Sequence, residues 1–243
     1  MEINTIGIDL AKEVFQVHAV DARGHVVLKK KLKRKEMATF FANLTPCLIG
    51  IEACSSSHYW ARKLQSLGHQ VKLMAPQFVK PYVKANKNDA ADAEAICEAV
   101  TRPSMRFVGV KSVEQQTVLA THRVRSLLVA ERTAMVNQTR GLLGEFGLIA
   151  PKGVHALRSH LPDILEDAEN ELTPEMRELI TIMSDRISSI TEKLDELELK
   201  IKEGNKRNDL ISKLLSIPGI GPLTASAMVA TIGDFKEFKN GRE

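Results

Sequence analysis

The strictest constraint in this sequence is an apolar repeat between residues 174 and 203. Apolar side chains recur there at alternating intervals of four and three residues, and the positions between them are mostly charged. The repeat consists of Met176, Ile180, Met183, Ile187, Ile190, Leu194, Leu197 and Ile201. Such spacing keeps one narrow apolar stripe on a helix, which is typical of a coiled coil.

The partner of this stripe is either a second copy of the chain or another part of the same chain. In the first case the protein is a homo-oligomer, a dimer or a tetramer, held through Ile180, Ile187, Ile190, Leu194 and Leu197. In the second case the stripe packs on its own domain or on the helix expected at residues 113–143.

Residues 1–110 alternate between strand and helix patterns. Apolar runs at 4–9, 14–20, 25–32, 47–52 and 71–74 predict strands, and segments 36–44, 57–67 and 89–100 predict helices. This order predicts an α/β fold with a mixed sheet and flanking helices. A helical and coiled-coil region follows at 111–205, interrupted by a looser stretch near Pro151. Residues 206–243 begin a third segment, in which two helices flank a Gly-Ile-Gly turn.

The composition is that of a soluble globular protein, with 44% apolar and 26% charged residues. No apolar run approaches the roughly 20 residues that a membrane helix needs. The first residues do not resemble a secretory signal, so the cytoplasm is the expected location. Three cysteines without C-x-x-C spacing suggest neither a disulfide framework nor a zinc site.

The charges are divided unevenly along the chain. Residues 161–205 hold thirteen acidic and five basic side chains, a net charge of −8, which leaves +12 on the rest. This division suggests that one part meets a polyanion and another part meets protein.

Four acidic residues stand where the expected elements would bring them together. Asp9 and Glu52 each end a predicted strand, and Asp89 and Asp92 lie three residues apart in the first turn of a predicted helix. Strand ends in α/β sheets collect ligands. Four carboxylates suit Mg²⁺ or Mn²⁺ and the chemistry of phosphodiesters. Taken singly, each acid could also be a turn, surface or helix N-terminal residue.

Three short motifs carry these acids. They are Ile6-Gly7-Ile8-Asp9-Leu10-Ala11-Lys12, Gly50-Ile51-Glu52-Ala53 and Lys87-Asn88-Asp89-Ala90-Ala91-Asp92-Ala93. In order and spacing they resemble the motifs of the DEDD insertion-sequence transposases, also called bridge recombinases. Residues 217–225, with Gly219 and Gly221, look like the start of that family's C-terminal transposase domain.

The resemblance implies an RNase H-like (RuvC-like) domain whose metal-binding tetrad is Asp9, Glu52, Asp89 and Asp92. It also implies double-stranded DNA as substrate, a structured guide RNA, Mg²⁺ as cofactor and a coiled coil that mediates oligomerisation. Family members carry a catalytic serine beyond the Gly-x-Gly turn, in a segment expected after residue 243. No serine of this chain occupies that motif, so the chain is expected to be a fragment or a decayed copy.

Basic residues offer candidate nucleic-acid contacts. Six of the seven residues from 29 to 35 are cationic, among them Lys31, Lys33 and Arg34, although on a strand only alternate side chains share a face. The alternative is an edge strand protected by lysines. Arg123, Arg125 and Arg132 follow one long helix, and Gly219 and Gly221 form a turn that resembles a helix-hairpin-helix.

Two other functions compete with this one. An actin-like ATPase also opens with Gly-Ile-Asp, but it needs a glycine-rich phosphate turn where this chain has Leu10-Ala11-Lys12-Glu13. A catalytically incomplete protein that only binds nucleic acid and oligomerises is the other alternative.

Overall fold

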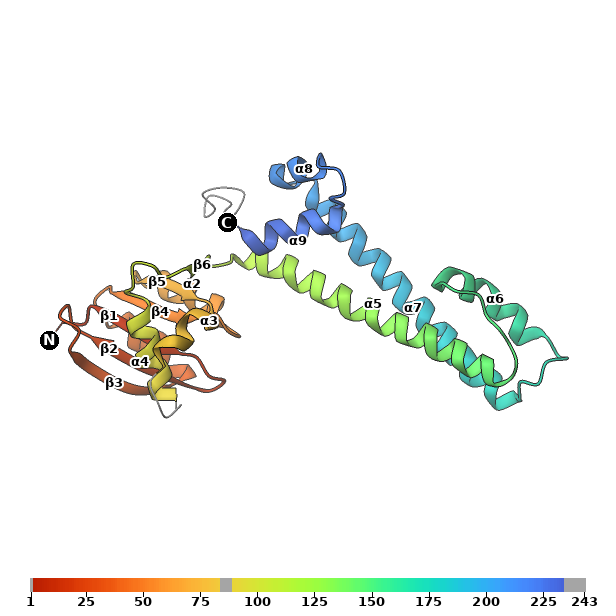
Figure 1. Cartoon of the computed structure of the whole chain (residues 1–243), viewed down its shortest axis with the longest axis horizontal. Coiled ribbons are helices and arrows are strands. Elements are labelled where there is room, and N and C mark those ends of the chain that lie inside the picture. The colour runs from red at the N-terminus through yellow and green to blue at the C-terminus, as the bar shows by residue number, and fades with distance from the viewer. Residues whose placement is uncertain (1, 84–88, 234–243) are drawn as a thin grey trace. The chain divides into compact units, whose positions relative to one another are not determined.

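The computed structural model describes residues 2–83 and 89–233. They form two compact units, one of the residues through Val113 together with Gly233, the other of Glu114–Ile232 (Figure 1). The first unit is a six-stranded mixed sheet with helices on both faces, and the second is helical. The expected α/β fold with a mixed sheet and flanking helices is therefore confirmed.

The sheet has the strand order β3-β2-β1-β4-β5-β6. Its strands are β1 (Thr5–Asp9), β2 (Val14–Val20), β3 (Val26–Lys33), β4 (Leu48–Glu52), β5 (Gln70–Met74) and β6 (Phe107–Val108). β2 pairs antiparallel with both β1 and β3, whereas β1, β4 and β5 run parallel to one another. The parallel strands bring the ends of β1 and β4, with Asp9 and Glu52, to one edge of the sheet.

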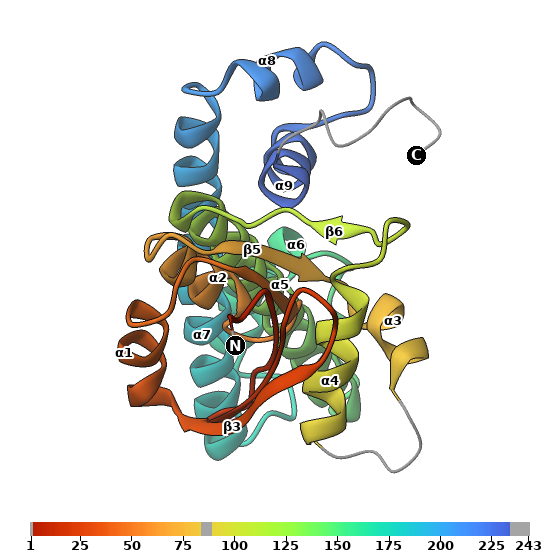
Figure 2. The same cartoon turned by 90° about the vertical axis from the view of Figure 1, so that its left-hand side faces the viewer.

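Helices cover both faces of this sheet (Figure 2). One face packs on α1 (Met37–Ala42) and α2 (Ser57–Gln65), where Ile6 and Ile8 are fully buried against residues such as Phe41 and Leu64. The other face packs on α4 (Asp89–Ala99). Short helical turns occupy η1 (Arg34–Glu36), α3 (Pro76–Val79) and η2 (Lys80–Tyr82).

Two glycines let α4 lie directly on the sheet. A Cβ on Gly7 would come within 2.2 Å of the Ala93 carbonyl oxygen and 2.3 Å of the Cys97 nitrogen. A Cβ on its register partner Gly50 would come within 2.7 Å of the Cβ of Val100, the residue that follows α4. Any side chain here would push the helix away, so Gly7 fixes the height of α4 above β1.

The second unit contains five helices among its described residues. They are α5 (Val113–Glu145, whose first residue belongs to the first unit), α6 (Val154–Glu166), α7 (Pro174–Asn205), α8 (Asp209–Leu215) and α9 (Pro222–Ile232). Figure 1 shows α5 and α7 side by side and antiparallel. Arg125 bonds to Glu198, Arg186 bonds to Glu131, and the Thr139 hydroxyl contacts the Met183 sulfur. These contacts hold α5 and α7 together as an antiparallel pair.

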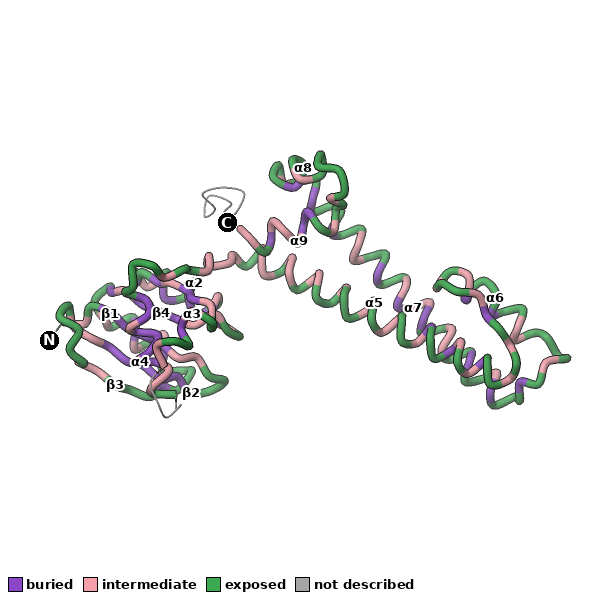
Figure 3. Tube along the Cα trace, viewed as in Figure 1, coloured by how far each residue is buried: buried purple, intermediate pink, exposed green. Residues whose placement is uncertain are grey.

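The apolar stripe of α7 is filled within one chain. Ile180, Ile187, Ile190 and Leu194 are at most 2% exposed, and Ile180 and Ile187 share a core with Val136 and Leu143 of α5. Figure 3 shows the buried positions recurring along α7. Within one chain these side chains pack on the helix near 113–143, as the alternative predicted; that they also join two copies stays a prediction. Leu197 is half-buried, and oligomerisation of the protein stays a prediction.

One helix, α6, lies between α5 and α7 in the chain. The helix α6 follows the loose stretch expected near Pro151 and was not predicted from the sequence, and Pro162 lies inside it. Among the described residues, no helix is both long enough and apolar enough to cross a bilayer.

Candidate metal centre and nucleic-acid surfaces

The four predicted carboxylates lie around one corner of the sheet. Asp9 is the last residue of β1 and Glu52 the last of β4, and these strands are parallel neighbours in which Ile8 pairs with Ile51. Asp89 and Asp92 occupy the first turn of α4. Because α4 crosses β1 at Gly7 and runs antiparallel to it, its first turn lies over the end of that strand.

Three of the four acids form a tight cluster. Carboxylate oxygens of Asp9, Asp89 and Asp92 all lie within 4.8 Å of one another, with Asp9 and Asp92 half-buried and Asp89 exposed. Glu52 is outside that group, although its charge acts on Asp9. The residues Lys87 and Asn88, which precede Asp89 in the motif, lie outside the described residues.

The electrostatics of the cluster are unfavourable without a counter-ion. Burial raises the pKa of Asp9 from 3.8 to about 6, and the charges of Asp92, Asp89 and Glu52 add to this increase. Burial, together with the charges of Glu52 and Asp9, also raises the pKa of the nearby Cys54 thiol. A cation would offset the part of these shifts that comes from repulsion between the carboxylates.

The chemistry of the donors is consistent with a divalent hard cation. All four candidate side chains offer carboxylate oxygens, which Mg²⁺ and Mn²⁺ prefer. The site is partly open to solvent, as Mg²⁺ sites are when the ion keeps several of its waters.

The basic residues of β3 divide between the two faces of the sheet. Lys29 reaches Glu94 of α4, with 3.6 Å between the amine and a carboxylate oxygen. Lys30 instead lies over the ring of Phe40 in α1, 5.0 Å from its centre. The alternation predicted from the sequence is therefore present, and Lys31 and Lys33 fall on the same face as Lys29. The guanidinium of Arg34 lies over Phe15 and Trp60 on the other face.

The arginines of α5 differ in their surroundings. Arg123 is exposed, whereas Arg125 donates two bonds to Glu198, the shorter at 2.6 Å. Arg132 is half-buried, and its Nε is enclosed without a hydrogen-bond partner among the described residues. Of the three predicted contacts, Arg123 is thus the one that is exposed.

The Gly-Ile-Gly turn joins α8 to α9. Gly219 has φ +89°, a conformation that favours glycine, and both Gly219 and Gly221 are exposed. Residues 234–243, the last part of the predicted segment 206–243, lie outside the described residues.

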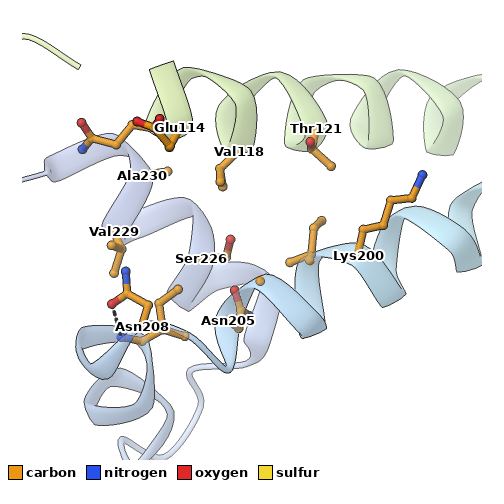
Figure 4. Close-up of a pocket in the computed structure, with 13 residues that line it drawn as sticks. Glu114, Val118, Thr121, Lys200, Asn205, Asn208, Ser226, Val229 and Ala230 are labelled. Carbon is orange, nitrogen blue, oxygen red and sulfur yellow. Dashed lines mark hydrogen bonds between the residues drawn. The ribbon is translucent and has the colours of Figure 1, made fainter. Parts of the chain in front are cut away.

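The helical unit also contains a pocket of about 230 Å³ between α5, α7, α8 and α9 (Figure 4). Ser226 of α9 is 3% exposed and points toward α5, where its hydroxyl lies 3.0 Å from Nε2 of His122. Burial, and then the charge of Arg125, lower the pKa of His122. The sequence did not predict this pair, because its members are 104 residues apart. We interpret it as a buried link between two helices.

Two family models match this chain. One, for the DEDD transposases of the IS110 type, covers residues 6–147, which include all four carboxylates. The other, described as the transposase IS116/IS110/IS902 family, covers residues 211–243.

Curated relatives agree with these matches. A probable family 20 transposase of Pseudomonas aeruginosa is 51% identical over 244 residues, covering 100% of this chain and 72% of the relative. The transposase for insertion sequence element IS1328 of Yersinia enterocolitica is 41% identical, covering 99% and 71%. The transposase for insertion sequence element IS1111A of Coxiella burnetii is 39% identical, covering 100% and 66%. This chain, with its acidic corner on a six-stranded mixed sheet, belongs to the IS110 family of DEDD transposases.

Proposed function

We propose that the sheet unit is the metal-dependent catalytic domain of this transposase and that Asp9, Glu52, Asp89 and Asp92 hold its metal ions. The observation that carries the proposal is the convergence of three carboxylates within 4.8 Å, with Glu52 on the adjacent strand. These residues come from two strands and a helix that are far apart in sequence, so the convergence is a property of the fold.

Each acid has a distinct structural support. Asp9 ends β1 and Glu52 ends β4, and each of these strands is hydrogen-bonded to a neighbour on both sides. Asp89 and Asp92 depend on the seating of α4 on Gly7. When bound, one or two Mg²⁺ ions would stabilise the charge on the attacking and leaving oxygens of a phosphodiester.

The substrate in this proposal is double-stranded DNA, which the element and its target supply. The exposed cations Lys31, Lys33 and Arg123 support nucleic-acid binding, since such side chains contact phosphates without reading sequence. A guide RNA is part of the proposal through the family resemblance, and the exposed Arg123 of α5 offers it a cationic contact. Both assignments require a direct binding measurement.

The test is DNA strand transfer by the protein that the complete element encodes. We expect Asp9→Asn and Glu52→Gln each to lower the rate by at least about 100-fold, because each removes a charged ligand of the proposed ions. Asp209→Asn, an exposed acid at the start of α8, serves as the matched control and should leave the rate unchanged. Normal strand transfer by both tetrad variants would contradict the assignment. Nucleic-acid binding without strand transfer by the wild type would favour the alternative of a nucleic-acid-binding protein without catalysis.

A further inference from the structure

A row of side chains leads from the carboxylates across the sheet to its edge. Asp9 pairs with Gln16 of β2, and Gln16 pairs with Lys31 of β3. Residues paired in this way point to the same face of a sheet. That face is the one under α4, because Gly7, two residues before Asp9, lies against that helix. With strands about 4.8 Å apart, the backbone of Lys31 lies about 10 Å from that of Asp9.

The same row borders a surface pocket of about 210 Å³ between β2, β3 and α4. Its walls include Gln16, His18, Lys29 and Lys31 from the strands, and Ala90 and Ala93 from the helix. The two alanines leave space above the strands where larger side chains would fill it. The pocket is therefore hollow, bordered by amines and an amide, and placed beside the acidic cluster.

Lys29 and Lys31 of the pocket differ in their ion pairing. The amine of Lys29 lies 3.6 Å from a carboxylate oxygen of Glu94, which offsets part of its charge. Lys31 is exposed and forms no ion pair with any residue in the described ranges 2–83 and 89–233. Its amine is therefore available for an anionic ligand.

The charged groups of other cations in the basic segment lie elsewhere, although Lys30 also borders the pocket. Lys30 stacks over Phe40, and Lys35 borders a separate hollow beside Thr39 and Asn43 on the α1 side of the sheet. The six cations between residues 29 and 35 are therefore not one surface. The subset formed by Lys29 and Lys31 faces the side of the carboxylates.

We propose that the pocket formed by Gln16, Lys29 and Lys31 binds one backbone phosphate of the DNA strand that enters the carboxylate site. A DNA strand carries its phosphates in a regular series, so a strand with one phosphodiester at Asp9 needs a cationic contact a short distance away. Lys31 supplies the charge and the Gln16 amide supplies a hydrogen-bond donor. The proposal rests on the proposed function, because it takes the carboxylates as the reacting site.

The test compares Lys31→Ser with Lys35→Ser in the chain of residues 1–243. These variants lose the same charge from the same basic segment but on different sides of the sheet. The probe is a short fluorescein-labelled DNA duplex, titrated in Ca²⁺ at several salt concentrations and followed by fluorescence anisotropy. An RNA strand of the same sequence is titrated in parallel, and the Mg²⁺-induced rise in melting temperature is measured for each variant.

We expect Lys31→Ser to weaken DNA binding about fivefold to tenfold. The slope of log affinity against log salt concentration should fall by about one, the value for one lost phosphate contact. Lys35→Ser should change the affinity less than about twofold. Equal losses in the two variants would overturn the pocket, because the contribution would then be general charge. A loss confined to RNA would overturn the assignment to DNA. Lys31→Ser should keep the Mg²⁺ effect of the wild type. If the wild type shows no Mg²⁺ effect, the metal site fails, which is a different result from failure of the pocket.

Discussion

At the scale of single residues, the acidic corner depends on opposing requirements. Asp9, a ligand in the proposed site, is partly buried, and this burial disfavours the charged form that a cation would need. The neighbouring carboxylates add repulsion. Without a bound cation, such a site lowers the stability of the folded protein. This is expected where the needs of a functional site oppose those of stability.

The pKa of Asp9 gives the first prediction. The folded-state pKa of Asp9, about 6, exceeds its ordinary pKa of 3.8. The stability that this carboxyl contributes is therefore present below pH 3.8 and is lost as the pH rises through about 6. Without metal, Asp9→Asn should therefore raise the free energy of unfolding at neutral pH by about 1–2 kcal/mol after allowance for solvent screening.

Urea unfolding in EDTA measures this effect. The gain should disappear when the experiment is repeated in acid below the ordinary pKa of the carboxyl, because Asp9 is then protonated in both states. A variant that is less stable than the wild type at neutral pH without metal would show that Asp9 is stabilised by something other than a cation.

The second residue-scale prediction concerns Gly7. Gly7→Ala places a Cβ 2.2 Å from the Ala93 carbonyl oxygen, so α4 must shift away from β1. We expect the free energy of unfolding to fall by about 3 kcal/mol and Mg²⁺ binding to weaken, since Asp89 and Asp92 move with the helix. The control is Gly141→Ala in α5, where nothing lies within 4 Å and a gain of about 0.5–1 kcal/mol is expected. Equal stabilities for the two alanine variants would contradict this role of Gly7.

At the scale of elements, the sequence predicted most of the sheet unit correctly. The strands ending at Asp9 and Glu52 were recognisable because each is a short apolar run followed by an acid. The strand β6 was missed because its two residues carry no period. The helix α6 was missed because Pro162 interrupts its pattern.

Contacts between elements were harder to predict than the elements themselves. The heptad pattern correctly predicted one apolar stripe on α7, but a stripe does not identify its partner. Likewise, the alternation of the lysines in β3 followed from the sequence, whereas the face that holds Lys31 became known only from its register with Gln16 and Asp9. Register is a long-range property, set by pairing between strands.

The partner of α7 can be tested with two substitutions on the same helix. Ile187→Asp puts a charge at a position with no exposed surface, and we expect it to lower the free energy of unfolding by about 4 kcal/mol. Ile182→Asp makes the same change at a position that is 58% exposed and should alter stability by less than about 0.5 kcal/mol.

Thermal unfolding reports the stability, and light scattering reports the mass in solution. If Ile187→Asp halves the mass and leaves the unfolding transition of the monomer unchanged, the stripe joins two copies and the intrachain assignment is wrong.

At the scale of the whole molecule, the chain consists of two units with different chemistry. The sheet unit brings together carboxylates and a basic pocket, which is what a site for a phosphodiester requires. The helical unit contains an acidic helix, α7, whose apolar side is already covered by α5. The acidic character of α7 agrees with the uneven charge along the sequence. Residues 161–205 carry a net charge of −8, and the rest of the chain carries +12.

The central claim is that the carboxylate cluster binds a divalent cation, and direct Mn²⁺ binding measured by electron paramagnetic resonance tests it most simply. The titration uses the chain of residues 1–243, Asp92→Asn, and Asp209→Asn as a control acid on α8. We predict saturable Mn²⁺ binding by the wild type and by Asp209→Asn, competition by Mg²⁺, and a loss of affinity of at least about tenfold in Asp92→Asn. Equal Mn²⁺ binding by all three proteins, or none by the wild type, would contradict the account.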